Sequence, residues 1–171
     1  MKNDDIVITS AFRTAIGTFR GSLKGMQAHD LGALTIEAVM QKSNLNPNDV
    51  DELIMGQVLT SATGQNPARQ AAILAKMPVE KTAYVINQVC GSGLRSVAAG
   101  YQAIMCNDSK IIIAGGQESM TNAPHAIYFR DGEKLDEAKL IDTMIKDGLW
   151  DAFNGYHMGV TAENVATKWQ I

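Results

Sequence analysis

The chain has 171 residues, enough for one domain with a sizeable apolar core and part of a second. Apolar residues make up 46% and charged residues 19%, which excludes an intrinsically disordered chain. The 15 basic and 18 acidic residues give a net charge of -3 and are mixed along the chain, so nothing predicts binding to nucleic acid or to an anionic membrane. No run of residues has the length of a membrane span or the pattern of a secretory signal, and we expect a cytoplasmic protein.

Short apolar runs alternate with helical patterns over the first two thirds of the chain. The apolar runs predict strands buried on both faces, as in a parallel sheet, at residues 6–8, 53–55, 84–86 and 111–114. The helical patterns cover residues 30–43, with Asp30 as the expected N-cap, then 67–77 and 91–106. This alternation predicts an α/β fold with right-handed crossovers and helices on both faces of the sheet.

The pattern changes after Gly115 and Gly116. Residues 117–158 are rich in Met, Asp, Gly and aromatic residues, contain one amphipathic stretch at 135–145, and read as a functional excursion from the sheet. A last helix, with Thr161 as the expected cap, reaches the end of the sequence without a glycine or proline to stop it. From this we expect the chain to be incomplete relative to its fold.

Cys90 stands between a predicted strand and a predicted helix, followed by Gly91 and Gly93. At a helix N-terminus the unpaired N–H groups and the macrodipole favour the thiolate, and the glycines leave the sulfur open to a substrate. The backbone N–H groups of Cys90 and Gly91 are candidates to bind an oxyanion formed during acyl transfer. A lone cysteine is also among the residues most often buried as a small hydrophobe, so the local pattern alone leaves both interpretations open.

Other kinds of site are disfavoured by spacing. If one helix joins Cys90 to Cys106, their Cα atoms lie about 24 Å apart, too far for a disulfide. Neither cysteine has a second Cys or a His at metal-ligand spacing, so no metal site is predicted. A dinucleotide fingerprint starting at Gly91 is weak, because Ser96 takes the place of its third glycine and no acidic residue ends the next strand.

Four ordered segments together resemble the thiolase family, nearest its biosynthetic type, and span nearly the whole chain. They are IMGQVLTSATGQNPARQAA (54–72), INQVCGSGLRSV (86–97), AGGQESMTNAPH (114–125) and DTMIKDGLWDAFNGYHMGVTAEN (142–164). The resemblance implies a ping-pong acyl transfer in which the Cys90 thiolate takes an acetyl group from acetyl-CoA. A second acetyl-CoA then attacks it to give acetoacetyl-CoA and CoA, or the reverse thiolysis occurs, with no metal or redox cofactor.

The resemblance also implies roles for residues far from Cys90. His157 matches a histidine that lines the thioester end of the coenzyme A pocket, and Met158 and Leu149 match neighbours that shape the acyl site. Residues 1–117 correspond to an N-terminal α/β domain lacking its last strand, and residues 118–171 to the beginning of a loop domain. The C-terminal catalytic domain, which supplies a histidine, a second cysteine and an Asn-His oxyanion pair, is not represented. Members of the family are expected to form homodimers or homotetramers.

Two hypotheses follow from this pattern. In the first, the sequence is the N-terminal portion of an active thiolase, and these 171 residues alone are inactive in condensation because no residue matches the general base. In the second, they form a stand-alone, non-catalytic half that binds coenzyme A or associates with itself through exposed apolar surface. A condensing enzyme of the ketoacyl-synthase type shares the fold and the cysteine, but the block HMGVTAEN (157–164) argues against it.

Overall fold

A computed structural model of the chain describes residues 5–130 and 139–171. The chain divides into two compact units, Met1–Asn122 and Ala123–Ile171, which are described in turn. None of the helices in the described residues is long and apolar enough to span a membrane.

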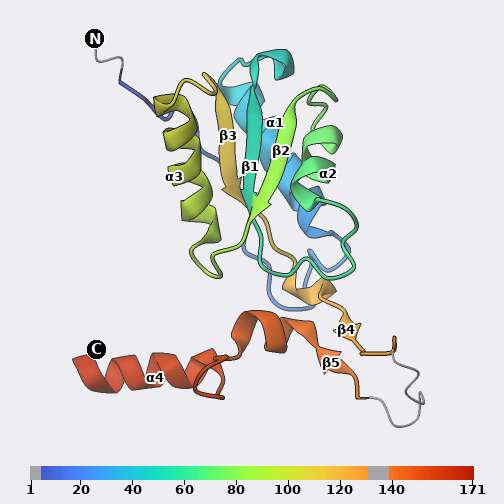
Figure 1. Ribbon diagram of the computed structural model, residues 1–171, viewed down its shortest axis with the longest axis vertical. Coiled ribbons are helices and arrows are strands. Elements are labelled where there is room, and N and C mark those ends of the chain that lie inside the picture. Colours follow the sequence, from blue (N-terminus) through green and yellow to red (C-terminus); the bar gives the residue numbers. More distant parts are fainter. Residues whose placement is uncertain (1–4, 131–138) are drawn as a thin grey trace. The chain divides into compact units, whose positions relative to one another are not determined.

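The first unit is built on a parallel sheet of three strands, β1 (Glu52–Gly56), β2 (Thr82–Ile86) and β3 (Ile112–Gly116). Their order is β2-β1-β3, with β1 in the centre and buried over most of its length (Figure 1). Gly56 pairs with Ile86 on one side and with Gly116 on the other, so the carboxyl ends of the three strands lie at one level. This edge is where ligands bind in open α/β sheets.

Helices cover both faces of this sheet. The helices α1 (Ala28–Lys42) and α2 (Pro67–Leu74) pack against each other on one face, where their side chains form a core with Leu53 and Met55 of β1. Helix α3 (Ser92–Met105) lies on the other face, against β1 and β3 (Figure 1). A short 3-10 turn, η1 (Pro47–Asp49), precedes β1, and a second, η2 (Met120–Asn122), follows β3. The predicted α/β class, three of the strands and these three helices are confirmed.

The predicted strand at residues 6–8 is wrong. These residues have no regular secondary structure, and Ile8 is 79% exposed. A strand requires hydrogen bonding to a neighbour, and this segment forms no ladder among the described residues, although the outer edge of β3 is unpaired beside it. The apolar run is real, but hydrophobicity alone does not make a strand.

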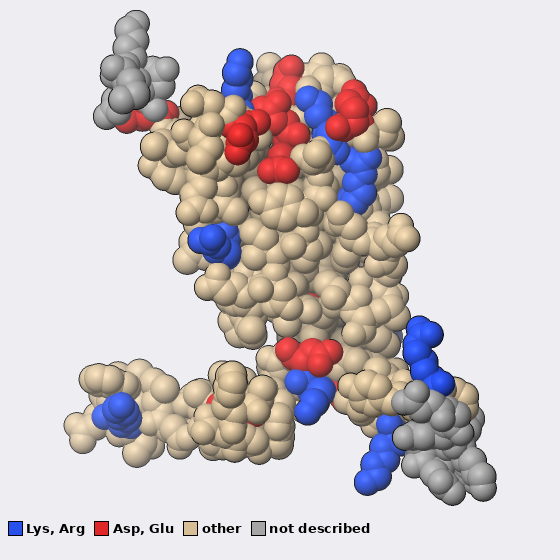
Figure 2. Space-filling model, viewed as in Figure 1, with Lys and Arg blue, Asp and Glu red and all other residues tan. Residues whose placement is uncertain are grey.

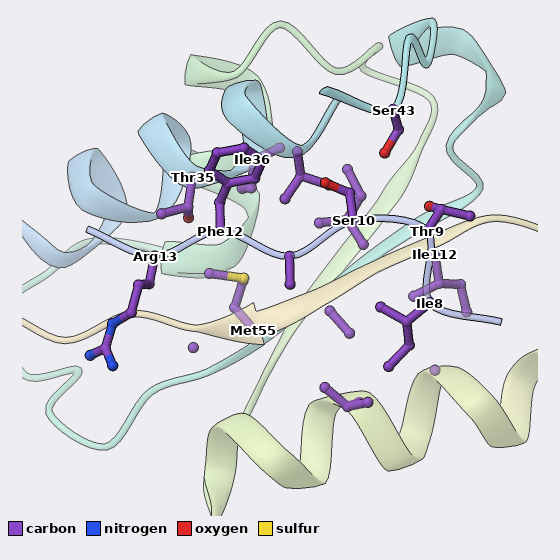
Figure 3. A pocket seen from close by; sticks show the side chains of 18 of the residues that line it. Ile8, Thr9, Ser10, Phe12, Arg13, Thr35, Ile36, Ser43, Met55 and Ile112 are labelled. Atoms are coloured by element: carbon purple, nitrogen blue, oxygen red, sulfur yellow. The ribbon is translucent and has the colours of Figure 1, made fainter. Parts of the chain in front are cut away.

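An apolar groove of about 580 Å³ lies between this segment and β3 (Figure 3). In it Phe12 points towards Ile36 of α1, while Ile8 and Ile112 lie further along (Figure 3). The groove is lined by residues 6–14 together with parts of α1, β3 and α3. It accounts for many of the exposed apolar side chains near the N-terminus.

The start of α1 also differs from the prediction. The helix begins at Ala28 with Gln27 as its N-cap, not with Asp30. The Asp30 carboxylate instead accepts a hydrogen bond of 2.8 Å from the backbone N–H of Gln27. An acidic residue in the first turn can thus stabilise a helix that begins before it.

The second unit contains β4 (His125–Ala126) and β5 (Ile141–Asp142), which pair antiparallel, then the π-helical turn η3 (Met144–Leu149) and helix α4 (Met158–Trp169). Of the predicted amphipathic stretch, residues 135–138 lie outside the described residues, and the rest forms β5 and the start of η3.

Both predicted features of the last helix need correction. Thr161 lies inside α4, whose N-cap is His157. The helix is also stopped, because Gln170 takes a left-handed conformation (φ 54°) and the N–H of Ile171 donates to the carbonyl of Ala166.

Charge is unevenly spread over the first unit. On the face shown in Figure 2, acidic and basic side chains gather mostly at the end where the strands begin, and the middle of this face is largely uncharged. At that end Asp51 accepts hydrogen bonds from the N–H groups of Lys110 and Ile111, which lower the pKa of its carboxyl.

Candidate active site

Cys90 lies in the tight turn that joins β2 to α3. β2 ends at Ile86 and α3 begins at Ser92, so the turn occupies residues 87–91 at the carboxyl edge of the sheet. The Cys90 side chain is exposed, and both it and Cys106 are free thiols, as the sequence predicts. Cys90 is therefore not the small buried hydrophobe that the local pattern left open.

Hydrogen bonds close this turn on itself. The N–H of Val89 donates to the Asn87 side chain (2.9 Å), and the N–H of Gly91 donates to the carbonyl of Gln88 (3.0 Å). The hydroxyl of Ser92 accepts from the N–H of Gln88 (2.8 Å) and donates to the carbonyl of Val89 (2.6 Å). The turn is thus closed by hydrogen bonds between its own residues and the start of α3.

Glycines let the first turn of α3 rest directly on the ends of the strands. A Cβ at Gly56 would lie 2.4 Å from the carbonyl carbon of Ser92, and one at Gly116 would lie 3.4 Å from Gly93. No side chain larger than hydrogen fits at Gly56 without moving the helix. The position of Cys90 is thus tied to the sheet through backbone contacts.

The two candidate oxyanion donors differ in the structure. The N–H of Gly91 already donates to Gln88, so an oxyanion would have to compete for it. The N–H of Cys90 makes no hydrogen bond among the contacts within residues 5–130 and 139–171. Cys90 is the better placed of the two donors.

A polar network beneath this edge was not foreseen from the sequence. The side chains of Gln57 and Gln117 are buried and joined by a hydrogen bond of 2.8 Å. The carboxylate of Glu118 accepts from the N–H groups of Val58 (2.8 Å) and Leu59 (3.3 Å). Burial raises the pKa of Glu118, and the N–H donors of Val58, Leu59 and Ser119 act in the opposite direction. The network joins the segments that follow β1 and β3.

The other three predicted site residues meet at the base of one loop in the second unit. Trp150 and His157 form an antiparallel bridge, which brings Leu149 on one side and Met158 on the other next to the paired residues. Nδ1 of His157 accepts a hydrogen bond from the N–H of Gly159 (3.0 Å), which leaves Nε2 to carry the proton of the neutral ring. His157 and Met158 are exposed, and Leu149 is half-buried.

The described residues form no metal-binding cluster, and the apolar groove does not extend to Cys90. Within residues 5–130 and 139–171 no three His, Cys, Asp or Glu side chains gather in a way that could hold a metal ion. The apolar groove is lined in part by Gln117 and Glu118 but by no residue of the turn 87–91. The groove and the turn that carries Cys90 are therefore separate features of the first unit.

Comparison with known proteins identifies the family. A family model described as "Thiolase, N-terminal domain" matches residues 6–171. This chain belongs to the thiolase family. Its relatives include proteins named acetyl-CoA acetyltransferase from Paracoccus denitrificans (58% identical, 96% of this chain, 42% of the relative), Rhizobium meliloti strain 1021 (58%, 100% and 44%) and Pseudomonas aeruginosa (54%, 98% and 43%). The chain thus spans less than half the length of these thiolase relatives and matches the N-terminal domain.

Proposed function

We propose that this protein transfers acyl groups between coenzyme A thioesters, condensing two acetyl-CoA to acetoacetyl-CoA or running the reverse thiolysis. The proposal is carried by the exposed thiol of Cys90 in a closed turn at the carboxyl edge of the sheet, in a chain of the thiolase family. The names of the relatives supply the substrate class.

In the first step the thiolate of Cys90 attacks the carbonyl carbon of acetyl-CoA. A carbon–sulfur bond forms to Cys90, the bond to the coenzyme A sulfur breaks, and coenzyme A leaves as a thiolate that is then protonated. The N–H of Cys90 stabilises the oxyanion of the intermediate. The thioester supplies its own leaving group, so no metal or redox cofactor is required.

In the second step a carbanion of another acetyl-CoA attacks the acetyl carbonyl carbon on Cys90. A carbon–carbon bond forms, the carbon–sulfur bond to Cys90 breaks, and the Cys90 thiolate is released together with acetoacetyl-CoA. We assign His157, with Met158 and Leu149, to the binding of the thioester end of the substrate. We assign the base that removes the methyl proton to the part of the longer relatives that this chain does not span. We also propose that the protein assembles as a homodimer or homotetramer.

The test is acetylation of Cys90. The 171-residue chain is incubated with acetyl-CoA, and acetyl on the Cys90 and Cys106 peptides is measured by mass spectrometry. We expect acetyl on Cys90 at least about tenfold above Cys106, since the proposed oxyanion donor lies at Cys90, and no measurable condensation by this chain alone.

Cys106→Ser, at the other end of α3, is the matched control and is expected to leave the labelling intact. Equal labelling of the two cysteines, or none of Cys90 in a full-length relative that turns over, would contradict the mechanism. Release of acetoacetyl-CoA by the 171-residue chain would show that the base lies within it.

A further inference from the structure

Val89, directly before Cys90, has a left-handed backbone conformation with φ 47°. For a β-branched residue this conformation is rare and costly, because Cβ crowds the following carbonyl. Its side chain is 52% exposed, so burial of the valine does not offset that cost. Such a conformation persists only where surrounding interactions determine it.

The hydroxyl of Ser92 supplies the strongest of these interactions. It accepts from the N–H of Gln88 and donates to the carbonyl of Val89, at 2.8 and 2.6 Å. One side-chain oxygen therefore bonds to a backbone group before the Val89 φ angle, the N–H of Gln88, and to one after it, the carbonyl of Val89.

The surroundings of Ser92 make these bonds effective. Ser92 is only 3% exposed, and its backbone lies against Gly56, so the hydroxyl cannot move away and water does not compete for it. The other side-chain bond of the turn, from Val89 N–H to Asn87, is exposed and weaker.

We propose that Ser92 is the positioning residue of the nucleophile. Its hydroxyl holds Val89 in the left-handed region and so fixes Cys90 at the amino end of α3 with the sulfur outward. The role in catalysis rests on the acyl transfer proposed above, whereas the geometry belongs to the turn itself. Ser92 acts through Cys90 and does not contact the substrate.

The first experiment compares Ser92→Ala with Ser96→Ala. Ser96 is a matched control because it is buried one turn along α3, and its hydroxyl bonds to the carbonyls of Gly93 and Gly115 but not to the turn. Both thiols of each variant are alkylated with iodoacetamide from pH 6 to 9, the rates are read from the two cysteine peptides, and the fold is checked by circular dichroism.

In Ser92→Ala the ratio of Cys90 to Cys106 alkylation is expected to fall about fivefold at neutral pH, the loss associated with one hydrogen bond. In Ser96→Ala the ratio is expected to stay as in the unsubstituted chain, although stability falls. An unchanged ratio in folded Ser92→Ala, or an equal fall in the two variants, overturns the proposal.

The second experiment replaces Val89 by Asn, a residue that tolerates the left-handed conformation. We expect Val89→Asn to raise the melting temperature and the double variant Ser92→Ala, Val89→Asn to recover the alkylation ratio to within about twofold. Val79→Asn is the control, since Val79 is also exposed but lacks a positive φ, and no rise is expected there. A lower melting temperature for Val89→Asn overturns the proposal even if Ser92→Ala does not fold.

The two proposals fail separately. A Cys90 that is never acetylated, with a ratio that still responds to Ser92→Ala, removes the acyl transfer and leaves the positioning role. If Cys90 is acetylated but its alkylation ratio does not change in Ser92→Ala, the acyl transfer stands and the positioning role is removed.

Discussion

Glu118 and His157 each use a side chain to hold backbone N–H groups. The Glu118 carboxylate bonds to the segment after β1, and His157 Nδ1 bonds to the first turn of α4. Single side chains of this kind join elements that the sequence pattern treats as independent.

The raised pKa of Glu118 predicts a pH-dependent stability. Because burial favours the protonated carboxyl, its contribution is fully present below the ordinary value of 4.5 and is lost as the pH rises through the higher pKa of the folded state. As the pH rises above 4.5, the free energy of unfolding is therefore expected to fall less in Glu118→Gln than in the unsubstituted chain. Urea denaturation at each pH measures this. Glu80→Gln, at an exposed position, is expected to leave the slope unchanged, and a steeper slope in Glu118→Gln would contradict the assignment.

The N-cap at His157 predicts different outcomes for two substitutions. His157→Asn keeps a side-chain acceptor for the N–H of Gly159, whereas His157→Ala removes it, at a cost of about 1 kcal/mol. Hydrogen exchange at Gly159 is expected to speed up about fivefold in His157→Ala and little in His157→Asn. Equal exchange in all three proteins would rule out the cap.

At the scale of elements, the contact between α3 and the sheet decides where Cys90 stands. Parallel strands of equal length end together, and glycines at Gly56 and Gly116 bring the helix backbone against that edge. The packing is between main chains, so it leaves no hydrophobic signature in the sequence.

Gly56→Ala tests this contact. The added methyl would meet the backbone of Ser92 and Gly93, and overpacking of this kind costs about 1–3 kcal/mol. We expect a loss of this size in the free energy of unfolding and slower alkylation of Cys90. Gly25→Ala, where no atom lies within 4 Å of the added methyl, is the control. An unchanged free energy of unfolding in Gly56→Ala would show that α3 can move away from the strand without loss of stability.

The sequence pattern predicts the strands and helices that have strong apolar periodicity, and it misses what depends on pairing or on polar contacts. Residues 53–55 form a strand because neighbours flank them on both sides, while residues 6–8 are equally apolar but pair with no strand among the described residues. Cys90 could be found because glycines follow it, but Ser92 could not, because serine hydroxyls at helix starts usually have only a local role. Val89 carries no signal at all, since valine is the residue least expected in a left-handed turn.

At the scale of the whole molecule, each unit carries much apolar surface. Val7, Ile8 and Phe12 border the groove beside β3, and Phe153 is 97% exposed in the second unit. An unpaired strand edge next to an apolar groove is a site where other apolar molecules bind. This surface is the observation that favours the alternative function of self-association.

The groove predicts binding of an apolar dye. We expect 8-anilinonaphthalene-1-sulfonate fluorescence to rise on mixing with the folded chain, and to fall by about half in Ile8→Lys, Phe12→Lys because the charged heads hydrate the groove. Phe153→Lys removes a similar apolar side chain outside the groove and is expected to change the signal little. An equal loss in both variants would assign the dye to exposed side chains in general.

The contact of Gly56 with Ser92 has a consequence for how substrates must arrive. A nucleophile carried by a mobile loop can swing towards its electrophile, but the turn that carries Cys90 is joined to the central strand through the main chain. Cys90 therefore keeps its position relative to the sheet of the first unit. In the acyl transfer proposed above, the thioester carbonyl of the first acetyl-CoA must therefore come to the sulfur, and the methyl carbon of the second must come to the acetyl group that the sulfur carries. On the same proposal, adaptation to longer or shorter acyl chains falls to the residues that surround the substrate, because the cysteine keeps one place in both steps.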